Sequence, residues 1–571
     1  MRDQRYDLLF DPVKIGPLTA KNRFYQVPHC NGGGCRDPSA AAEMRRVKSE
    51  GGWGVIFTEQ VEIHHSSEIT PFIELRIWDD DDIPALVMAE LLSDARDEVG
   101  DTCAIAVRLS LDELAGPKGF TNQELREVVH MHSDLPDLWD FAHGTWEACS
   151  GTSRFKPEAA QEDLIRGLKQ LTSKPVVGVG RFTSPDLMVP QVKQGLMDFV
   201  GAARPSIADP FLPQKIDQGR VEDIRECIGC NICVSGDMTQ SLSRCTQNSS
   251  FMEEWRKGWH PERIKPRKSE GRVLVVGAGP TGLSAAHKLG LRGYDVSLAE
   301  AGKELGGRVS LESKLPGLSA WARVRDYRVG QIDKMLNVNI YRDSQLSAVD
   351  VFEFGAEHVC IATGATWRKD GIARFNLLPI AIDHAIPIFS PDDLMAGAKS
   401  KGHVVVYDDD HYYMANVLAE LLVKNGNSVT FVTPSTKVSE WSFNTLEQGL
   451  IQQRLLEIGV DIRVTRGLAE IHQTYVSISC VYTGKLTQVD CDAVVLVTSR
   501  LPNDQLYLDL KARENEWVEA GIQTVRVVGD ANAPAAIAWA TYAGHRYAEE
   551  LDEPELGDRL PFRREVVGLK D

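Results

Sequence analysis

Four cysteines near the middle of the chain have the spacing that holds a metal cluster. Cys227, Cys230 and Cys233 are each separated by two residues, and Cys245 follows after eleven more. This pattern is typical of a four-thiolate iron–sulfur cluster, because one short loop presents three sulfurs and the distant cysteine supplies the fourth. A zinc site with four cysteine ligands is the main alternative, although zinc sites usually join two separate pairs of cysteines. The sequence therefore predicts an iron–sulfur cluster, with zinc or free thiols as the alternatives.

A glycine-rich turn further along the chain has the pattern of a dinucleotide site. Gly277, Gly279 and Gly282 directly follow a β-type run at 272–276, and Glu300 ends the next such run. The glycines permit a tight turn and a close approach of phosphate, and the acid lies where a ribose hydroxyl binds. The glycine spacing alone is a weak signal. The strand before it, the helix after it and the acid together predict a complete nucleotide-binding unit.

Two later segments resemble parts of further nucleotide-binding units. A second strand and helix begin at 402–407, but Asp408–Asp410 occupies the turn where glycines are needed. Three carboxylates repel a pyrophosphate, so we predict a Rossmann-like unit that binds no dinucleotide. Near the end of the chain, a strand at 525–529 delivers Asp530 to the edge of a flavin or nucleotide. The alternative is that this Asp caps the following helix.

Length, charge and cysteine content limit the class of protein. A chain of 571 residues has room for two to four domains. Its 63 basic and 81 acidic residues leave a formal net charge of −18, which argues against nucleic acid or an anionic membrane as partner. The first residues lack the apolar run of a signal peptide, and no stretch approaches the roughly 20 apolar residues that span a bilayer. Because the eleven cysteines fit a reducing compartment, we expect a cytoplasmic protein.

The first 225 residues alternate short β-rich runs with amphipathic helical stretches. Such alternation predicts a parallel sheet, either doubly wound or closed into a barrel, with its chemistry in the turns that follow the strands. The cysteine-bearing segment that follows has few strands. The predicted domains are a β/α domain at 1–225, the cysteine loop and linker at 226–270, a nucleotide-binding domain at 271–395 to which the chain returns at 490–571, and a second Rossmann-like domain at 396–489.

Together these segments resemble the family of trimethylamine, dimethylamine and histamine dehydrogenases, which is related to old yellow enzyme and 2,4-dienoyl-CoA reductase. The resemblance covers most of the chain. It implies an α/β protein with an N-terminal (β/α) barrel of TIM type that carries FMN, a loop that holds a 4Fe–4S cluster, and two Rossmann-like domains. The segments that carry the resemblance are 22–30, the Cys227–Cys245 loop, 203–210 and the Gly277–Gly282 turn.

The resemblance implies that FMN is bound covalently through the sulfur of Cys30, as 6-S-cysteinyl FMN. The alternative interpretation of this cysteine is a small buried apolar residue. The phosphate of FMN needs cations and backbone donors, which barrels supply from the loops after their last two strands. Structural salt bridges are the alternative for the arginines. The expected flavin contacts are Arg108 near the ring, and Gly180, Arg181, Ala203 and Arg204 at the phosphate.

Three positions of the family's amine pocket correspond to Gln60, Trp146 and Asp237. The trimethylamine enzymes bind their cation in a bowl of three aromatic rings by cation–π attraction, and here only the tryptophan is retained. Gln60 and Asp237 make the pocket more polar, and Asp237 can pair with a second cationic group, a combination that resembles histamine dehydrogenase. A solvated loop carboxylate is the alternative for Asp237. With Cys30, these three are the predicted catalytic residues.

The N-terminal domain departs from the family in its number of strands. TIM barrels have eight strands and about 250 residues, whereas the segment from 8 to 225 has only about six recognisable strands. One helix at 83–99 stands in place of two further βα units. The family's Tyr/His pair after the fourth strand has no counterpart, and its acidic neighbour corresponds to Cys149. An abridged gene product, a degenerate homologue and a barrel closed by other means are the three explanations.

The function implied by the resemblance is oxidation of a small amine, histamine-like or methylated. The α-carbon delivers hydride to FMN, and water hydrolyses the resulting iminium. Electrons then pass through the 4Fe–4S cluster to an electron-transferring flavoprotein, in a homodimer that also holds ADP (or FAD). An NAD(P)H-dependent enoate or dienoyl-CoA reductase is one alternative. A degenerate, non-catalytic homologue that has lost its substrate wall is the other.

Overall fold

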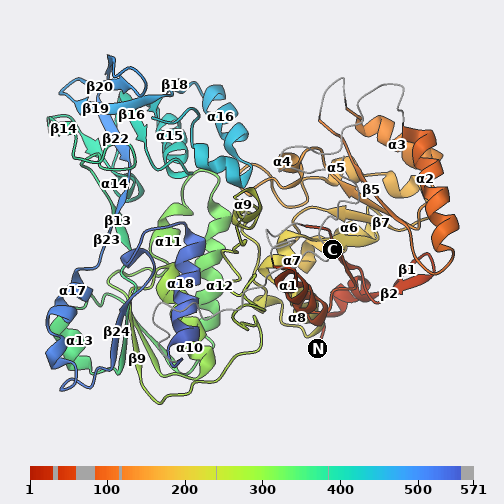
Figure 1. Cartoon of the computed structure of the whole chain (residues 1–571), viewed down its shortest axis with the longest axis horizontal. Coiled ribbons are helices and arrows are strands. Elements are labelled where there is room, and N and C mark those ends of the chain that lie inside the picture. Colours follow the sequence, from red (N-terminus) through yellow and green to blue (C-terminus); the bar gives the residue numbers. More distant parts are fainter. Residues whose placement is uncertain (30–36, 59–83, 115–118, 240, 384, 554–571) are drawn as a thin grey trace, which may run out of the picture. The chain divides into compact units, whose positions relative to one another are not determined.

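The computed structural model describes residues 1–29, 37–58, 84–114, 119–239, 241–383 and 385–553. The chain forms two compact units, which we describe separately (Figure 1): unit 1 is built from Met1–Glu262 and unit 2 from Arg263–Asp558. Among the described helices, none combines the length and apolar character that a bilayer crossing requires.

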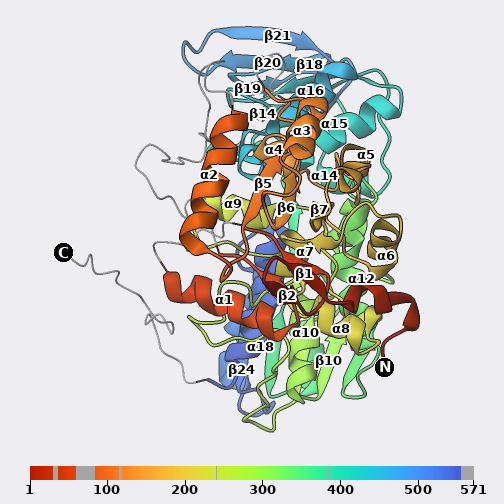
Figure 2. The same cartoon turned by 90° about the vertical axis from the view of Figure 1, so that its right-hand side faces the viewer.

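Unit 1 is organised around a parallel sheet of six strands (Figure 2). Their number agrees with the six or so strands that are recognisable in the sequence. A short antiparallel hairpin, β1 (Val13–Ile15) with β2 (Leu18–Ala20), precedes the sheet. In spatial order the strands are β4 (Val55–Ile56), β3 (Phe24–Gln26), β8 (Phe199–Gly201), β7 (Val176–Val179), β6 (Leu138–Ala142) and β5 (Ala106–Ser110).

Strands β4 and β5 are consecutive along the chain, yet they lie at opposite edges of this sheet. Between them in sequence, the described residues contain the single helix α2 (Pro84–Val99). In a closed eight-stranded barrel, two further strands would join these edges. The prediction of a TIM-type barrel that lacks about two βα units is therefore confirmed, in the form of a parallel half-barrel.

Both faces of the half-barrel are apolar, as expected of a parallel sheet that is covered on both sides. Neighbouring residues of β6 alternate between them: Trp139 and Phe141 pack in the outer core, whereas Leu138 packs inside with Tyr25 and Phe199. The hairpin β1–β2 contributes to the inner core. Helices whose residues fill the outer core are α3 (Asn122–Met131), α6 (Pro185–Lys193) and α8 (Leu212–Asp217).

Unit 2 contains the predicted nucleotide-binding sheet, with helices on both of its faces (Figure 1). Val273 and Val275 pack in one core together with helices α10 (Pro280–Arg292) and α18 (Ile537–Glu550). Their neighbours Leu274 and Val276 pack in the opposite core, with α13 (Ala348–Phe354) and α17 (Gln505–Ala512). The five parallel strands in spatial order are β11 (Val338–Tyr341), β10 (Val296–Ala299), β9 (Val273–Val276), β12 (His358–Ile361) and β24 (Thr524–Val527).

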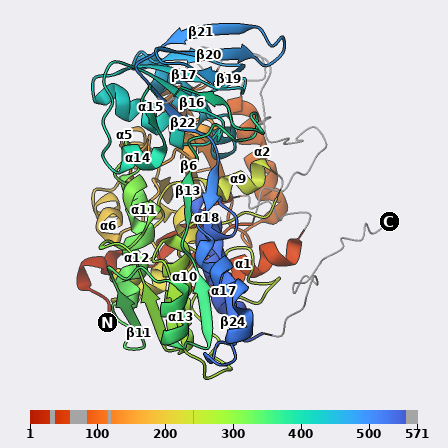
Figure 3. The ribbon, with the colours of Figure 1, turned by 90° about the vertical axis from the view of Figure 1, so that its left-hand side faces the viewer.

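A second parallel sheet in unit 2 forms the other Rossmann-like part (Figure 3). Helix α15 (Met414–Lys424) follows its central strand β16, and β13 (Ala365–Trp367) pairs with β23 (Arg500–Pro502). A mixed sheet adjoins it, formed by β14 (Ala381–Ile382), β19 (Arg466–Ile471), β20 (Tyr475–Cys480) and β21 (Leu486–Asp490). The parallel strands in spatial order are β15 (Ile388–Phe389), β22 (Ala493–Val497), β16 (His403–Asp408), β17 (Ser428–Val432) and β18 (Asp461–Arg463).

The half-barrel predicts uneven backbone protection within unit 1. Strand β7 lies between two neighbours, whereas β5 pairs only with β6 among the described strands. We expect the amides of β5 to exchange with deuterium at least about tenfold faster than those of β7, because edge strands open more readily. Hydrogen exchange resolved by mass spectrometry measures this. Equal protection of β5 and β7 would contradict an edge position for β5.

Candidate active site and cofactor sites

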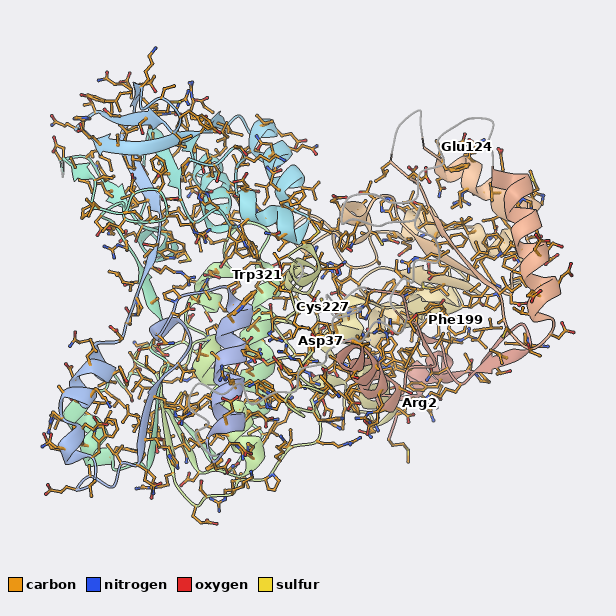
Figure 4. All side chains as sticks on the ribbon, in the orientation of Figure 1. Arg2, Asp37, Glu124, Phe199, Cys227 and Trp321 are labelled. Carbon is orange, nitrogen blue, oxygen red and sulfur yellow. The ribbon has the colours of Figure 1, made fainter. Side chains whose placement is uncertain are left out.

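The loop with the four cysteines folds through two left-handed residues. Gly229 (φ 63°) and Asn231 (φ 56°) flank Cys230 and reverse the chain direction between the first and third cysteines. The Gly229 amide donates to Sγ of Cys227 at 3.4 Å, and Cys230 Sγ lies 3.2 Å from the hydroxyl of Thr246. Such N–H···S contacts tune and stabilise cluster thiolates. Figure 4 labels Cys227 within this loop.

The four thiols are neighbours in the structure, which fits the predicted cluster. Burial raises the pKa of Cys233, and the charges of Cys245, Cys227 and Cys230 raise it further. Within the described residues, no three His, Cys, Asp or Glu side chains form a group that could hold a metal ion. The four thiols lie near one another, and both the iron–sulfur cluster and its zinc alternative stay predictions.

Arg204, a predicted phosphate contact, connects three loops of unit 1. It is the first residue of α7 (Arg204–Ala208), and Ala203 precedes that helix. Its Nη1 donates to the carbonyls of Ser150 and Gly151 at 3.0 and 2.9 Å, and to Asn231 Oδ1 at 2.7 Å. Asn231 in turn donates to Ser150 O at 2.6 Å. The arginine predicted to bind the flavin phosphate is thus bonded to the cysteine loop.

Arg181 makes a similar connection after β7. It has a left-handed backbone (φ 54°), and its Nη2 donates to the carbonyl of Lys156 at 2.8 Å. A Cβ placed on Gly229 would lie 2.9 Å from its Nη1, so the guanidinium packs against the cysteine loop. Gly180 O accepts from the amide of Ala159 at 2.9 Å. The loops after β7 and β8 therefore both contact the segment 150–159.

Arg108, the predicted contact of the flavin ring, faces a buried acid. It is the register partner of Asp140 on β6, and its Nη1 lies 3.6 Å from Asp140 Oδ2. Asp140 is 2% exposed, and no described residue donates to its Oδ1. Burial raises the pKa of Asp140 to about 6, although the charge of Arg108 acts in the opposite direction. Burial raises the pKa of the nearby Tyr25, and the charge of Asp140 raises it further. The sequence analysis did not identify Asp140, whose only signal is a charged residue inside an apolar strand.

The predicted amine-pocket residues lie on two short helices. Trp146 begins α4 (Trp146–Cys149), which follows β6 and is capped by Thr145. Asp237 lies one turn after Cys233 on α9 (Ile232–Met238), so a predicted amine contact and a predicted cluster ligand share a helix. Both side chains are partly buried. The other two predicted catalytic residues, Cys30 and Gln60, lie outside the described residues.

In unit 2, the three glycines of the predicted nucleotide-binding turn, Gly277, Gly279 and Gly282, differ in their local environment. Gly277 has φ 99°, a conformation that favours glycine, and a Cβ on Gly282 would lie 1.8 Å from the Gly277 carbonyl oxygen. A Cβ on Gly279 would meet nothing within 4 Å, so the open position lies at the start of α10, where a phosphate binds. Glu300 accepts from the amides of Ala278 and Gly302, both at 2.8 Å. The residues present fit a nucleotide.

Two further glycines, Gly306 and Gly307, lie against the Gly277–Gly282 turn, and the sequence analysis missed them. The Gly306 amide donates to Ala278 O at 2.8 Å, and a Cβ on Gly307 would lie 3.1 Å from Cα of Gly279. The chain therefore passes close to the fingerprint turn a second time. Its sequence signal is a Gly-Gly-Arg run shortly after Glu300.

Asp530 is held by two arginines. Its Oδ2 accepts from Arg308 at 2.7 Å and from Arg500 at 2.8 Å, and its Oδ1 accepts from the amide of Ala535 at 3.0 Å. Arg308 also bonds Tyr413 at 3.0 Å. This buried network links the nucleotide-binding sheet to the second Rossmann-like part, and it leaves both Asp530 oxygens occupied.

The acidic turn after β16 is buried inside the second Rossmann-like part. Asp408 is fully buried, and burial raises its pKa to about 7. Asp409 accepts from the amide of Phe375 at 2.9 Å and lies 3.2 Å from Nε2 of His411. The turn after β16 therefore carries two buried carboxylates, and the absence of a dinucleotide site here stays a prediction.

Two family models match the chain. Residues 8–89 and 86–223 match the NADH:flavin oxidoreductase / NADH oxidase family, and residues 271–544 match the pyridine nucleotide-disulphide oxidoreductase family. The first match is divided between β4 and β5, where the sheet opens. These matches assign FMN-dependent oxidoreductase character to the half-barrel and a nucleotide- or flavin-binding domain to unit 2.

Three characterised proteins resemble the whole chain. Dimethylamine dehydrogenase from Hyphomicrobium sp. (strain x) is 34% identical over 716 residues, covering 99% of this chain and 97% of that protein. The structure of histamine dehydrogenase from Rhizobium sp. 4-9 has 52% identity and a TM-score of 0.96, with 100% of both chains covered. The structure of 6-hydroxypseudooxynicotine amine oxidase from Pseudomonas geniculata N1 has 39% identity and a TM-score of 0.89, covering 96% of this chain and 99% of that one.

The buried position of Asp140 predicts that its carboxyl is protonated in mildly acidic solution. Because its folded pKa of about 6 lies above the usual value of 3.8, the folded protein holds this proton until the pH rises through about 6. Infrared difference spectra should show that a protonated-carboxyl band is lost when the pH is raised from about 5 to about 7, roughly one unit on either side of that pKa. The lost band should be smaller in Asp140→Asn, where Asp408, with a pKa of about 7, still loses part of its protons in this range. It should be unchanged in Asp198→Asn, which removes an ion-paired acid elsewhere in unit 1. A lost band of the same size in Asp140→Asn and in the wild type would contradict the assignment.

Proposed function

This chain belongs to the trimethylamine, dimethylamine and histamine dehydrogenase family, and we propose that it oxidises a small amine with FMN bound in its half-barrel. The observation that carries the proposal is the contact of Arg204 with Asn231 at 2.7 Å. Asn231 lies between two cluster cysteines, so the loop expected to hold the flavin phosphate is bonded to the loop expected to hold the cluster. Such an arrangement suits transfer of electrons from flavin to cluster.

FMN, when bound and attached to Cys30, would supply the acceptor for the hydride of the amine's α-carbon. The residues of the chain orient it and adjust the charge around it. Arg181 and Arg204 offer cations at the carboxyl ends of β7 and β8, the usual position of phosphate in such barrels. Arg108 and Asp140 place a cation and a titratable acid inside the sheet, below those loops.

The proposed amine contacts are Trp146 and Asp237, together with Gln60, which lies outside the described residues. Trp146 offers an aromatic face to the substrate cation, and Asp237 pairs with a second cationic group. This combination favours a histamine-like diamine over a methylated monoamine. One helical turn separates Asp237 from Cys233, so the substrate pocket adjoins the cluster.

A 4Fe–4S cluster would be held by Cys227, Cys230, Cys233 and Cys245 and would carry electrons from the flavin to an electron-transferring flavoprotein. The active form is a homodimer. The close approach of the four thiols and the N–H···S contact to Cys227 support the cluster. The acceptor and the dimer are proposed from family membership.

The nucleotide of unit 2 is ADP. Gly279 leaves open space for a phosphate, whereas Asp530, which would face the flavin end of FAD, already accepts from Arg308 and Arg500. The choice of ADP over FAD rests on membership of the amine dehydrogenase family.

The reductase alternative is weaker. It requires a second functional dinucleotide site for NAD(P)H, and the Asp408–Asp410 turn fills that position with buried carboxylates. The relatives that match the full chain at 34% identity or more are named for the oxidation of amines.

Two glycine substitutions separate nucleotide binding from folding. In Gly279→Ala the added methyl meets no protein atom within 4 Å, so we expect a folded protein that has lost at least about tenfold in affinity for ADP. In Gly282→Ala the methyl would lie 1.8 Å from Gly277 O, so we expect loss of stability by more than about 2 kcal/mol. Calorimetric titration with ADP and thermal unfolding measure the two effects. Unchanged ADP affinity in Gly279→Ala would contradict this site.

Substitution of Asp237 tests the substrate class. In Asp237→Asn we expect KM for histamine to rise about tenfold or more, since a charge pair is lost, while KM for dimethylamine stays within about twofold. Trp146→Leu should raise KM for both amines. Equal effects of Asp237→Asn on the two substrates would contradict the proposed role of this carboxylate.

A flavin and iron assay tests the cofactors together. After anaerobic purification and acid precipitation, the yellow colour should stay with the pellet, and about four irons per chain should be present. Cys30→Ala should release the flavin but keep the iron, and Cys245→Ala should lose the iron but keep the flavin in the pellet. Colourless wild-type protein with a normal iron count would mean that the half-barrel no longer holds FMN, and the proposed activity would fall.

A further inference from the structure

His143 is the first residue after strand β6, at the carboxyl end where parallel β/α sheets place their chemistry. Two hydrogen bonds attach this position to the end of β5. The Gly144 amide donates to Ser110 Oγ at 2.8 Å, and the Leu111 amide donates to Ala142 O at 2.7 Å. The imidazole is therefore held on a well-anchored turn, three residues before Trp146.

The imidazole of His143 has an unusual environment for a histidine that is partly buried. Its Nδ1 is shielded from solvent, and neither ring nitrogen forms a hydrogen bond with any described residue. Leaving a buried polar atom without a partner is costly, and such atoms in folded proteins often face a ligand. The imidazole is thus held in place, and no described residue donates a hydrogen bond to its nitrogens.

Two charged groups face this ring. Burial lowers the pKa of His143, the ammonium of Lys156 lowers it further, and the carboxylate of Asp112 opposes them. Lys156 is held elsewhere, because its Nζ donates to Ala148 O at 2.8 Å. The imidazole is therefore neutral at pH 7, and one of its nitrogens carries a free lone pair.

We propose that His143 binds the substrate, accepting a hydrogen bond from the N–H of the amine while Trp146 contacts the same cation. This inference rests on the proposed function and names a residue for its amine site. A neutral imidazole satisfies an ammonium donor without repelling its charge. No bond to carbon forms or breaks at His143, and no electrons pass through it. When the ring is protonated it loses its acceptor and repels the substrate, so binding should weaken in acid.

Two substitutions in the holoenzyme separate this role from a structural one. His143→Leu removes the acceptor, and we expect KM for histamine to rise about tenfold with kcat within about twofold. His143→Asn keeps an acceptor near the Nδ1 position but does not titrate. It should keep KM near the wild-type value and lose the fall of kcat/KM in acid, because the amide does not titrate whereas the imidazole does. His130→Gln, at an exposed position of α3, is the matched control and should change neither quantity.

A spectroscopic readout makes the test independent of turnover. In protein with ¹³C-labelled histidine, the His143 resonance is the one missing from His143→Asn, and it should shift when histamine is added without oxygen. An unmoved resonance, while histamine still perturbs the flavin absorbance, would overturn the role of His143 alone. If histamine changes neither signal, the proposed function fails and this inference fails with it. Equal KM values in wild type and His143→Leu would also overturn the inference.

Discussion

The guanidinium of Arg204 is the interaction on which the arrangement of unit 1 depends most. A single nitrogen donates to two carbonyls of the segment after β6 and to Asn231 in the cysteine loop. Arginine suits this position because it stays charged and presents several donors in a fixed geometry, and hydrogen bonds to a charged donor are stronger than neutral ones. Three loops, each expected to carry part of the chemistry, are therefore positioned relative to one another by one side chain.

The open sheet is compatible with this arrangement because of where its edges lie. The predicted flavin and amine contacts that follow strands come after β3, β6, β7 and β8, which are the four inner strands of the sheet. The two edge strands are β4 and β5. Gln60 follows β4 in the sequence, and Arg108 lies on β5. An internal shortening between β4 and β5 thus leaves most of the predicted flavin contacts directly after strands that have two neighbours.

Local patterns predicted the strands and the tight turn at Gly277, because each depends on residues close in sequence. The missed features depend on long-range pairing. Arg308 reaches Asp530 from more than 200 residues away, and Asp140 meets Arg108 only through the register of two strands. His143 was also missed, since a single histidine after a strand has no motif, and only the structure shows that its ring lacks a partner among the described residues.

The central claim is that amine oxidation in the half-barrel delivers electrons to the four-cysteine cluster. The most direct measurement is electron paramagnetic resonance of frozen, anaerobic protein before and after addition of histamine. The account predicts that histamine produces the signal of a reduced 4Fe–4S cluster in the wild type and none in Cys245→Ala. The account would be contradicted if, in protein that retains its flavin, dithionite produces the signal of the reduced cluster but histamine does not.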